Sequence, residues 1–259
     1  MRGRGYRKFE ERVWRSAFAS WPRAPRHPTP GYTLLLTVPP DLPVFLELAV
    51  AVCREQELHG LVETIVVPDA PSRPFRAVVE RLGAEWPEGR LRLVEPGRLS
   101  AFLRRRAHTP SMIHALQLIA GASQVRSTHA LMHDADLFLG DPAALDVLFE
   151  RCTTPGVDVV GVDPPPASSA WLGPERFAHI VASRELMFSM EWLRARPPNE
   201  IRPKSGQFPE GDFWFETTLL AQALTPPEKV ALQPAGSPSH SKTRHGSSIN
   251  GPTGSFAAF

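Results

Sequence analysis

Short apolar segments that alternate with helix-like segments constrain the fold of this chain more than any other feature. The run at 32–38 is apolar on both of its faces, as a central parallel strand is, and Pro39 ends it. Similar runs follow at 63–67, 90–94, 129–133 and 157–162. Between them, helical periodicity predicts helices at 43–59, 76–82, 110–125 and 142–152. The alternation predicts an α/β fold: one domain with a mostly parallel central sheet flanked by helices.

Composition narrows the setting in which such a domain works. The 259 residues are 42% hydrophobic and 22% charged, which is ordinary for a globular protein, and the formal charge of +2 does not demand a polyanionic partner. The only two cysteines, Cys53 and Cys152, lie in apolar helix-like segments, so we expect no disulfide partner. No apolar run has the length of a membrane span, and no signal-peptide core begins the chain. We therefore expect a cytoplasmic protein.

The chain divides by composition into four parts. Residues 1–30 form a basic amphipathic leader with a proline-rich linker, 31–163 and 164–233 form the two halves of the core, and 234–259 form a flexible polar tail. The apolar face of the leader carries residues at steps of three to four: Phe9, Val13, Trp14, Ala17, Phe18 and Trp21. This stripe either packs on the domain behind it or lies on an acidic partner or the inner membrane face, which would make the protein peripheral there.

Two aspartates at the end of a predicted strand form the first candidate site. Asp134 and Asp136 follow the apolar run at 129–133 with one residue between them. Ligands of open α/β sheets bind beyond the carboxyl ends of the strands, and paired carboxylates suit a hard cation such as Mg²⁺ or Mn²⁺ that substrate phosphates complete. The alternative is a loop in which one aspartate caps the next helix, although Asp141 already fills that role.

Residues at the ends of the first two strands form a candidate nucleoside cleft. Thr37 and Pro39 close the first strand, and Asp69 follows the second. A carboxylate there can accept a hydrogen bond from a ribose hydroxyl or a base imino group. The alternative is that Asp69 merely belongs to a proline-flanked turn.

Acidic and histidine residues further along the chain are candidates for proton transfer and for metal binding. Glu210 and Asp212 stand on a glycine-containing turn before a predicted apolar helix at 217–224, where a carboxylate can serve as a general base or only complement the helix dipole. His240 and His245 lie in the tail, and His245 is a candidate third metal ligand if the tail closes over the site; otherwise both are solvated.

The chain lacks a glycine-rich phosphate loop after its first strand, where Pro39 and Pro40 stand instead. Nicotinamide oxidoreductases and P-loop enzymes are therefore disfavoured. A nucleotide bound without such a loop needs another anchor for its diphosphate, and a metal held by Asp134 and Asp136 supplies one.

The order of these features resembles that of the GT-A-fold glycosyltransferases, especially the family-2-like inverting enzymes, over residues 31 to 225. The resemblance implies a hexosyltransferase-like enzyme that moves a sugar from a nucleoside-diphosphate sugar to an unidentified acceptor hydroxyl with inversion. It also implies that residues 31–163 bind the nucleotide sugar through a DxD motif and that 164–233 bind the acceptor.

The resemblance assigns a role to each candidate. Asp69 would contact the base or ribose, Asp134 the ribose or sugar, and Asp136 would be the direct Mg²⁺ or Mn²⁺ ligand. Asp212 would match the base that deprotonates the acceptor, with Glu210 as its neighbour or substitute.

Two departures from the family pattern stand out. Gly211 separates acids that the family commonly keeps adjacent, which leaves Glu216 a further candidate base, and Pro40 replaces a usual polar residue. The alternatives to a glycosyltransferase are a nucleotidyltransferase and a non-catalytic nucleotide-binding module of the same fold.

We predict that Asp136→Ala abolishes Mn²⁺-dependent binding of a sugar nucleotide and leaves the fold intact. Losing one of two protein ligands from a site otherwise completed by water and phosphate removes most of the affinity. Calorimetry with a nucleoside diphosphate and Mn²⁺ measures the loss, and an unchanged affinity contradicts the metal assignment.

Overall fold

The structure is a computed structural model that describes residues 12–14, 18, 25–38, 43–86, 90–95, 97–105, 109–135, 140–162, 177–208 and 211–233. For residues 99–100, 204–208 and 211–214 it describes the backbone and not the side chains.

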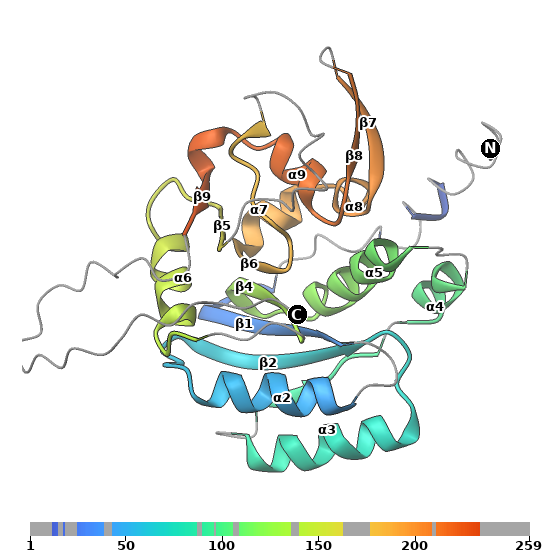
Figure 1. Ribbon diagram of the computed structural model, residues 1–259, viewed down its shortest axis with the longest axis vertical. Helices are drawn as coiled ribbons and strands as arrows, with labels where there is room; N and C mark the ends of the chain where they lie inside the picture. The colour runs from blue at the N-terminus through green and yellow to red at the C-terminus, as the bar shows by residue number, and fades with distance from the viewer. Residues whose placement is uncertain are drawn as a thin grey trace, which may run out of the picture.

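A seven-stranded sheet, with the order β3-β2-β1-β4-β6-β5-β9, is the centre of the molecule (Figure 1). Six of its strands run parallel and β6 runs antiparallel to both of its neighbours. Its strands are β1 (Thr29–Val38), β2 (Leu61–Pro68), β3 (Leu91–Leu93), β4 (Ser127–Asp134), β5 (Val159–Gly161), β6 (Glu185–Ser189) and β9 (Val230–Leu232). The predicted α/β domain with a mostly parallel sheet is confirmed.

Helices cover both faces of this sheet. They are α2 (Pro43–Arg54), α3 (Arg73–Glu85), α4 (Arg98–Arg104), α5 (Pro110–Ala122), α6 (Ala144–Cys152), α7 (Met190–Ala195), α8 (Pro198–Ile201) and α9 (Leu219–Ala223), with a short 3-10 turn at Pro227–Lys229. Leu34 and Leu36 of β1 share a core with α2, α3 and α6, whereas Leu35 between them shares a core with α5 and α7. Alternate side chains of a strand point to opposite faces, so a strand covered on both faces is apolar throughout, as the sequence predicts.

The strand register brings the polar candidates to one edge of the sheet. Thr37 of β1 pairs with Asp134 of β4 on one side, and Val38 pairs with Pro68 of β2 on the other. The carboxyl ends of these three neighbouring strands therefore meet, and Asp69 follows directly after Pro68.

Residues 211–215 form a strand where the sequence analysis places a turn that enters a helix. β8 (Gly211–Phe215) pairs antiparallel with β7 (Lys204–Phe208), and Asp212 lies opposite Gln207 in this hairpin. The helix begins only at Leu219. The aromatic residues at 213–215, which favour strands, outweigh the turn signal of the single glycine.

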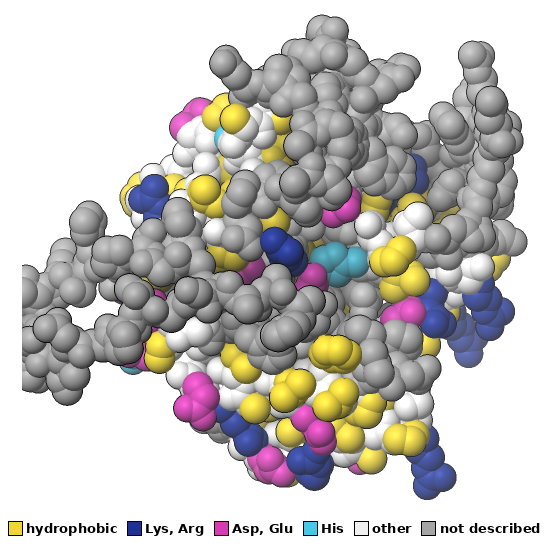
Figure 2. Space-filling view, in the orientation of Figure 1, with side chains coloured by type: hydrophobic (Ala, Val, Ile, Leu, Met, Phe, Trp, Pro, Cys, Tyr) yellow, Lys and Arg dark blue, Asp and Glu magenta, His cyan; other side chains and the backbone are white. Residues whose placement is uncertain are grey.

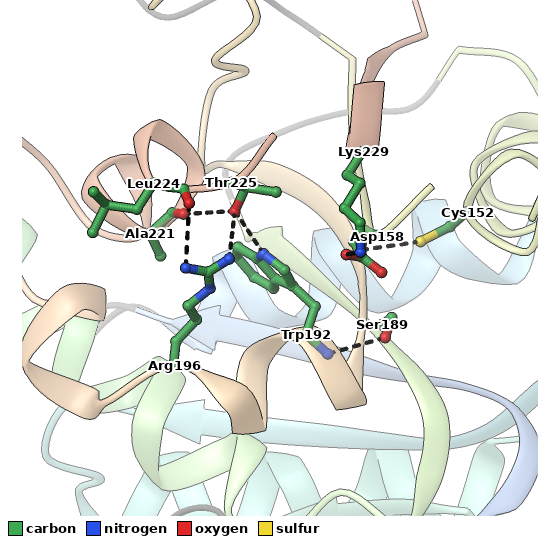
Figure 3. Close-up of polar contacts among 9 residues, drawn as sticks. All are labelled: Cys152, Asp158, Ser189, Trp192, Arg196, Ala221, Leu224, Thr225 and Lys229. Carbon is green, nitrogen blue, oxygen red and sulfur yellow. Dashed lines mark hydrogen bonds and ion pairs between the residues drawn. The ribbon is translucent and has the colours of Figure 1, made fainter. Parts of the chain in front are cut away.

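Thr225 fastens α9 to α7 (Figure 3). Its hydroxyl accepts hydrogen bonds from Trp192 Nε1 at 2.9 Å and from Arg196 Nη2 at 3.2 Å, and it donates to the carbonyl of Ala221 at 2.7 Å. A buried hydroxyl with three partners is fully satisfied. The helices that frame the second half of the chain are thus held to one another by polar contacts as well as by packing.

The aromatic stripe of the N-terminal leader reaches the core at Trp14. This side chain is 1% exposed, contacts Phe18 at a ring-centroid distance of 5.3 Å, and lies in the same core cluster as α5 and α7. The guanidinium of Arg202 lies 5.5 Å from the centre of its ring. Trp14 therefore packs on the domain, which is the first of the two interpretations of the stripe. β1 begins at Thr29, inside the segment that the sequence assigns to the linker. The basic residues before Arg12 lie outside the described residues.

Two further features bear on the setting of the protein. Cys53 and Cys152 are both free and buried. Among the described residues, no helix combines the length and the apolar character that crossing a membrane requires.

We predict that Trp14→Ala lowers the free energy of unfolding by about 3–5 kcal/mol, the usual cost of deleting a buried tryptophan side chain. Val44→Ala is the control, because Val44 is 49% exposed on α2 and surface changes alter stability by about 0.5 kcal/mol. Urea unfolding of both variants measures the difference. Equal stabilities would contradict the burial of Trp14.

Candidate functional site

Asp134 is the centre of a polar cluster at the carboxyl edge of the sheet. Its Oδ1 accepts a hydrogen bond of 2.7 Å from the hydroxyl of Thr37 and lies 3.1 Å from His114 Nε2. Its own N–H donates to the carbonyl of Arg184 at 3.1 Å. The space-filling view shows a histidine side chain beside acidic and basic ones near the middle of one face (Figure 2). β1, β4 and α5 thus each contribute a polar side chain to one point.

The surroundings of Asp134 favour its ionised form. Burial raises the pKa of this carboxyl. The charge and hydrogen bond of His114 and the hydrogen bond of Thr37 together lower the pKa by more than burial raises it, so that it lies below its ordinary value of 3.8. Asp134 is therefore a carboxylate at neutral pH. An ionised carboxylate with partial exposure is the form that binds a divalent cation or accepts hydrogen bonds from a sugar.

Gln117 of α5 holds the ends of β1 and β2 at a fixed spacing. Its buried side-chain amide donates to the carbonyl of Val38 at 3.0 Å and to the carbonyl of Val67 at 2.8 Å. The N–H of Asp69 also donates to Val38 O, at 3.3 Å. These bonds satisfy the backbone at the place where the two strands separate, and they fix Thr37 and Asp69 relative to each other.

Asp69 forms an ion pair with Arg104 at the end of α4. The side chain of Asp69 is 8% exposed, whereas that of Arg104 is 36% exposed. A buried carboxylate needs such a partner, because removal from water costs free energy that the pair offsets. The carboxylate of Asp69 can accept hydrogen bonds and the guanidinium of Arg104 can donate them, in the region where the sequence predicts a nucleoside-binding cleft.

His133 and Glu185 form a buried pair directly behind Asp134. His133 Nδ1 contacts Glu185 Oε2, and the two side chains are 0% and 1% exposed. Because β6 is antiparallel, its first residue, Glu185, arrives at the edge where the parallel strands end. The pair joins the backbone before Asp134 to the strand beside it and leaves Asp134 with little freedom to shift.

Four of the residues that build this cluster were missed by the sequence analysis: Arg104, His114, Gln117 and Glu185. A signal existed for His114 and Gln117, since they interrupt an apolar helix that leads into β4 and whose start must lie at the carboxyl edge. Arg104 and Glu185 carry no such signal.

The structure brings together Thr37, Asp69 and Asp134, on three neighbouring strand ends. The remaining candidates are placed only in part. Asp212 is described as backbone in β8, and Glu216, a half-buried residue, follows that strand. Pro39, Asp136, Glu210 and His245 lie outside the described residues, so their assignments stay predictions.

No protein-family model matches this sequence, and no curated protein matches it either. Solved structures do. A mannosyltransferase from Pyrobaculum calidifontis, PcManGT, in complex with GDP-Man and Mn²⁺ aligns with a TM-score of 0.54 and 18% identity, over 86% of this chain and 61% of that one. Glucosyl-3-phosphoglycerate synthase from Mycobacterium tuberculosis, in complex with phosphoglyceric acid, aligns with a TM-score of 0.52 and 14% identity, over 86% and 72% of the two chains. The fold is therefore that of the GT-A-type glycosyltransferases, and this chain spans less than two thirds of the mannosyltransferase's length.

We predict that His114→Ala raises the pKa of Asp134, because burial then acts with less compensation. The lowered pKa in the native protein contributes stability that is complete above the unfolded value of 3.8 and is lost as the pH falls through the folded value. The variant should lose this contribution at a higher pH. Carbon NMR of the Asp134 carboxyl in metal-free protein follows the titration, with His27→Ala, an exposed histidine, as control. Superimposable curves for His114→Ala and the native protein would refute the effect.

Proposed function

We propose that this chain is a metal-dependent glycosyltransferase that moves a sugar from a nucleoside-diphosphate sugar to an acceptor hydroxyl. The observation that carries the proposal is the ionised Asp134 at the carboxyl edge of a GT-A-type sheet, two residues before Asp136. The complex of the similar mannosyltransferase with GDP-Man and Mn²⁺ supports the choice of ligands.

The donor set at this edge fits a hard divalent cation. The Asp134 carboxylate is held ionised by Thr37 and His114, and oxygen is the ligand atom that Mn²⁺ and Mg²⁺ prefer. Asp136 would be the direct ligand, Asp134 would contact the ion or the sugar, and His245 would complete the set. A cation bound there would neutralise the charge that develops on the departing nucleoside diphosphate.

The strand ends would bind the nucleoside half of the donor. Thr37 lies at the end of β1, Pro39 follows that strand in the sequence, and the Asp69–Arg104 pair stands beyond β2, so a base or ribose placed here would meet both a carboxylate and a guanidinium. The amide of Gln117 keeps these strand ends from separating. A rigid donor site lowers the entropic cost of bringing the anomeric carbon in line with the acceptor.

The hairpin and the residue after it would serve the acceptor. Asp212 in β8 would take the proton of the acceptor hydroxyl as its oxygen attacks the anomeric carbon, in a single displacement that inverts the configuration. Glu210 and Glu216 are its rivals for this role, because they lie two residues before Asp212 and four after it.

Purified protein mixed with a panel of sugar nucleotides and Mn²⁺ tests the proposal. A transferase releases nucleoside diphosphate slowly by hydrolysis of its own donor, and Asp134→Asn should stop this release. Asp158→Asn is the matched control, because Asp158 lies at the amino end of β5, away from the candidate site, where its carboxylate pairs with Lys229 Nζ at 3.0 Å. Binding without any release would favour the non-catalytic module, and no binding of any donor would overturn the proposal.

We predict that Asp212→Asn slows transfer by about 10² to 10⁴-fold, the usual effect of removing a general base, and hardly changes sugar-nucleotide affinity. The substitution is nearly isosteric, so loss of folding does not imitate the result. Glu210→Gln and Glu216→Gln, assayed with the true acceptor, show whether either glutamate holds the role instead. Full activity in all three variants would mean that no base stands on this part of the chain.

A further inference from the structure

A second group of potential metal ligands lies at the amino ends of the strands, opposite the carboxyl ends where Asp134 stands. Glu57 and His59 follow α2 and precede the start of β2, and Asp146 lies in the first turn of α6. One ligand atom from each of the three side chains lies within 4.8 Å of the other two. Metal–ligand bonds to nitrogen and carboxylate oxygen are about 2.0–2.2 Å long, so one ion spans up to about 4.4 Å, and a small movement of the exposed Glu57 and His59 side chains brings all three ligands within reach.

The two segments that carry these ligands are fixed to one another by the backbone. The N–H of Glu57 donates to the carbonyl of Pro142, just before α6, at 2.7 Å. Gly60 has a φ of +80°, and a Cβ there would lie 2.6 Å from the ring of Phe149 in α6, so the turn after His59 packs directly on that helix. The three ligands therefore stand in a preformed arrangement and need little ordering on binding.

The buried side of this group contains polar atoms without partners. The Asp146 side chain is 13% exposed, and its Oδ2 contacts His59 Nδ1, whereas its Oδ1 is buried and has no hydrogen-bond partner in the described part of the chain. The hydroxyl of Tyr32, in a residue that is 0% exposed, also has no partner there. The two groups are close enough that, after burial, the charge of Asp146 is the next cause that raises the pKa of Tyr32.

Unpaired buried oxygens of this kind cost free energy that a bound ligand can relieve. The side chain of His59 is 82% exposed, which leaves a path from solvent to the three ligands.

We propose that Glu57, His59 and Asp146 bind one divalent transition-metal ion, with Zn²⁺ as the best match, and that the ion fastens α2 to α6. One imidazole nitrogen and two carboxylates form a donor set that zinc accepts, with water in the remaining position. Calcium and magnesium prefer oxygen ligands throughout, which the imidazole does not provide. The position at the amino ends of the strands gives the ion a structural role, distinct from the metal proposed at Asp134.

Zinc titration of the full-length protein tests the site. The Asp134→Asn/Asp136→Asn double variant, freed of metal, removes the first candidate site from the measurement. Calorimetry with Zn²⁺ alone should show one ion bound per chain, and Zn²⁺ should raise the melting temperature of this variant.

Three substitutions in that background locate the bound ion. Glu57→Gln and His59→Gln change exposed side chains, so they should leave the fold intact and weaken Zn²⁺ binding at least tenfold, since even changes behind a metal ligand cost about 10–100-fold. Glu55→Gln, an exposed acid two residues from Glu57 and outside the group, should leave the affinity unchanged.

No Zn²⁺ binding by the double variant, or binding that Glu57→Gln and His59→Gln leave unchanged, would overturn the proposal. Neither result affects the proposed transferase, whose Mn²⁺-dependent donor binding is measured in protein that retains Asp134 and Asp136.

Discussion

The paired hydrogen bonds of the Gln117 side chain to Val38 O and Val67 O fix the geometry on which the candidate site depends. Parallel strands separate where their ladder ends, and the carbonyls at that point need donors. Gln117 supplies both donors from α5, the helix that also carries His114. One buried amide therefore sets the spacing between Thr37 and Asp69 and the height of His114 above Asp134. A hydrophobic residue at 117 would remove this donor from Val67 O and leave Val38 O with only the N–H of Asp69, and an unsatisfied buried carbonyl costs about 1–3 kcal/mol.

Charge at this edge of the sheet is arranged in pairs. Asp69 lies against Arg104, Glu185 against His133, and Asp134 against His114. The first two acids are less than one tenth exposed, whereas the side chain of Asp134 is 29% exposed. Asp134 is thus the one of these three acids that is both ionised by its surroundings and open to a ligand, which agrees with its proposed place beside the metal and the donor sugar.

Local sequence patterns predict the parallel part of the fold and the carboxylates at its edge. The apolar runs identify β1, β2 and β4, and prolines mark the ends of the first two. The rule that ligands bind at carboxyl ends then selects Thr37, Asp69 and Asp134. The short strand β6 could not be predicted, because its five residues show no alternation and its partner, β4, is more than fifty residues away. The place of Glu185 at the candidate site could not be predicted for the same reason, because Glu185 is the first residue of β6. The local glycine signal predicts a turn at Asp212, because it cannot report the pairing of β8 with β7.

The contact between Trp14 and Arg202 bears on how the chain unfolds. Trp14 lies near one end of the sequence, and Arg202 stands two residues before the hairpin that carries Asp212. The indole also shares a core with α5 and α7, so one side chain contacts both of the halves that composition assigned to donor and acceptor. Contacts of this range couple the parts of a chain into one cooperative transition. The halves should therefore melt together, and neither should persist as a stable fragment after the other is cut away.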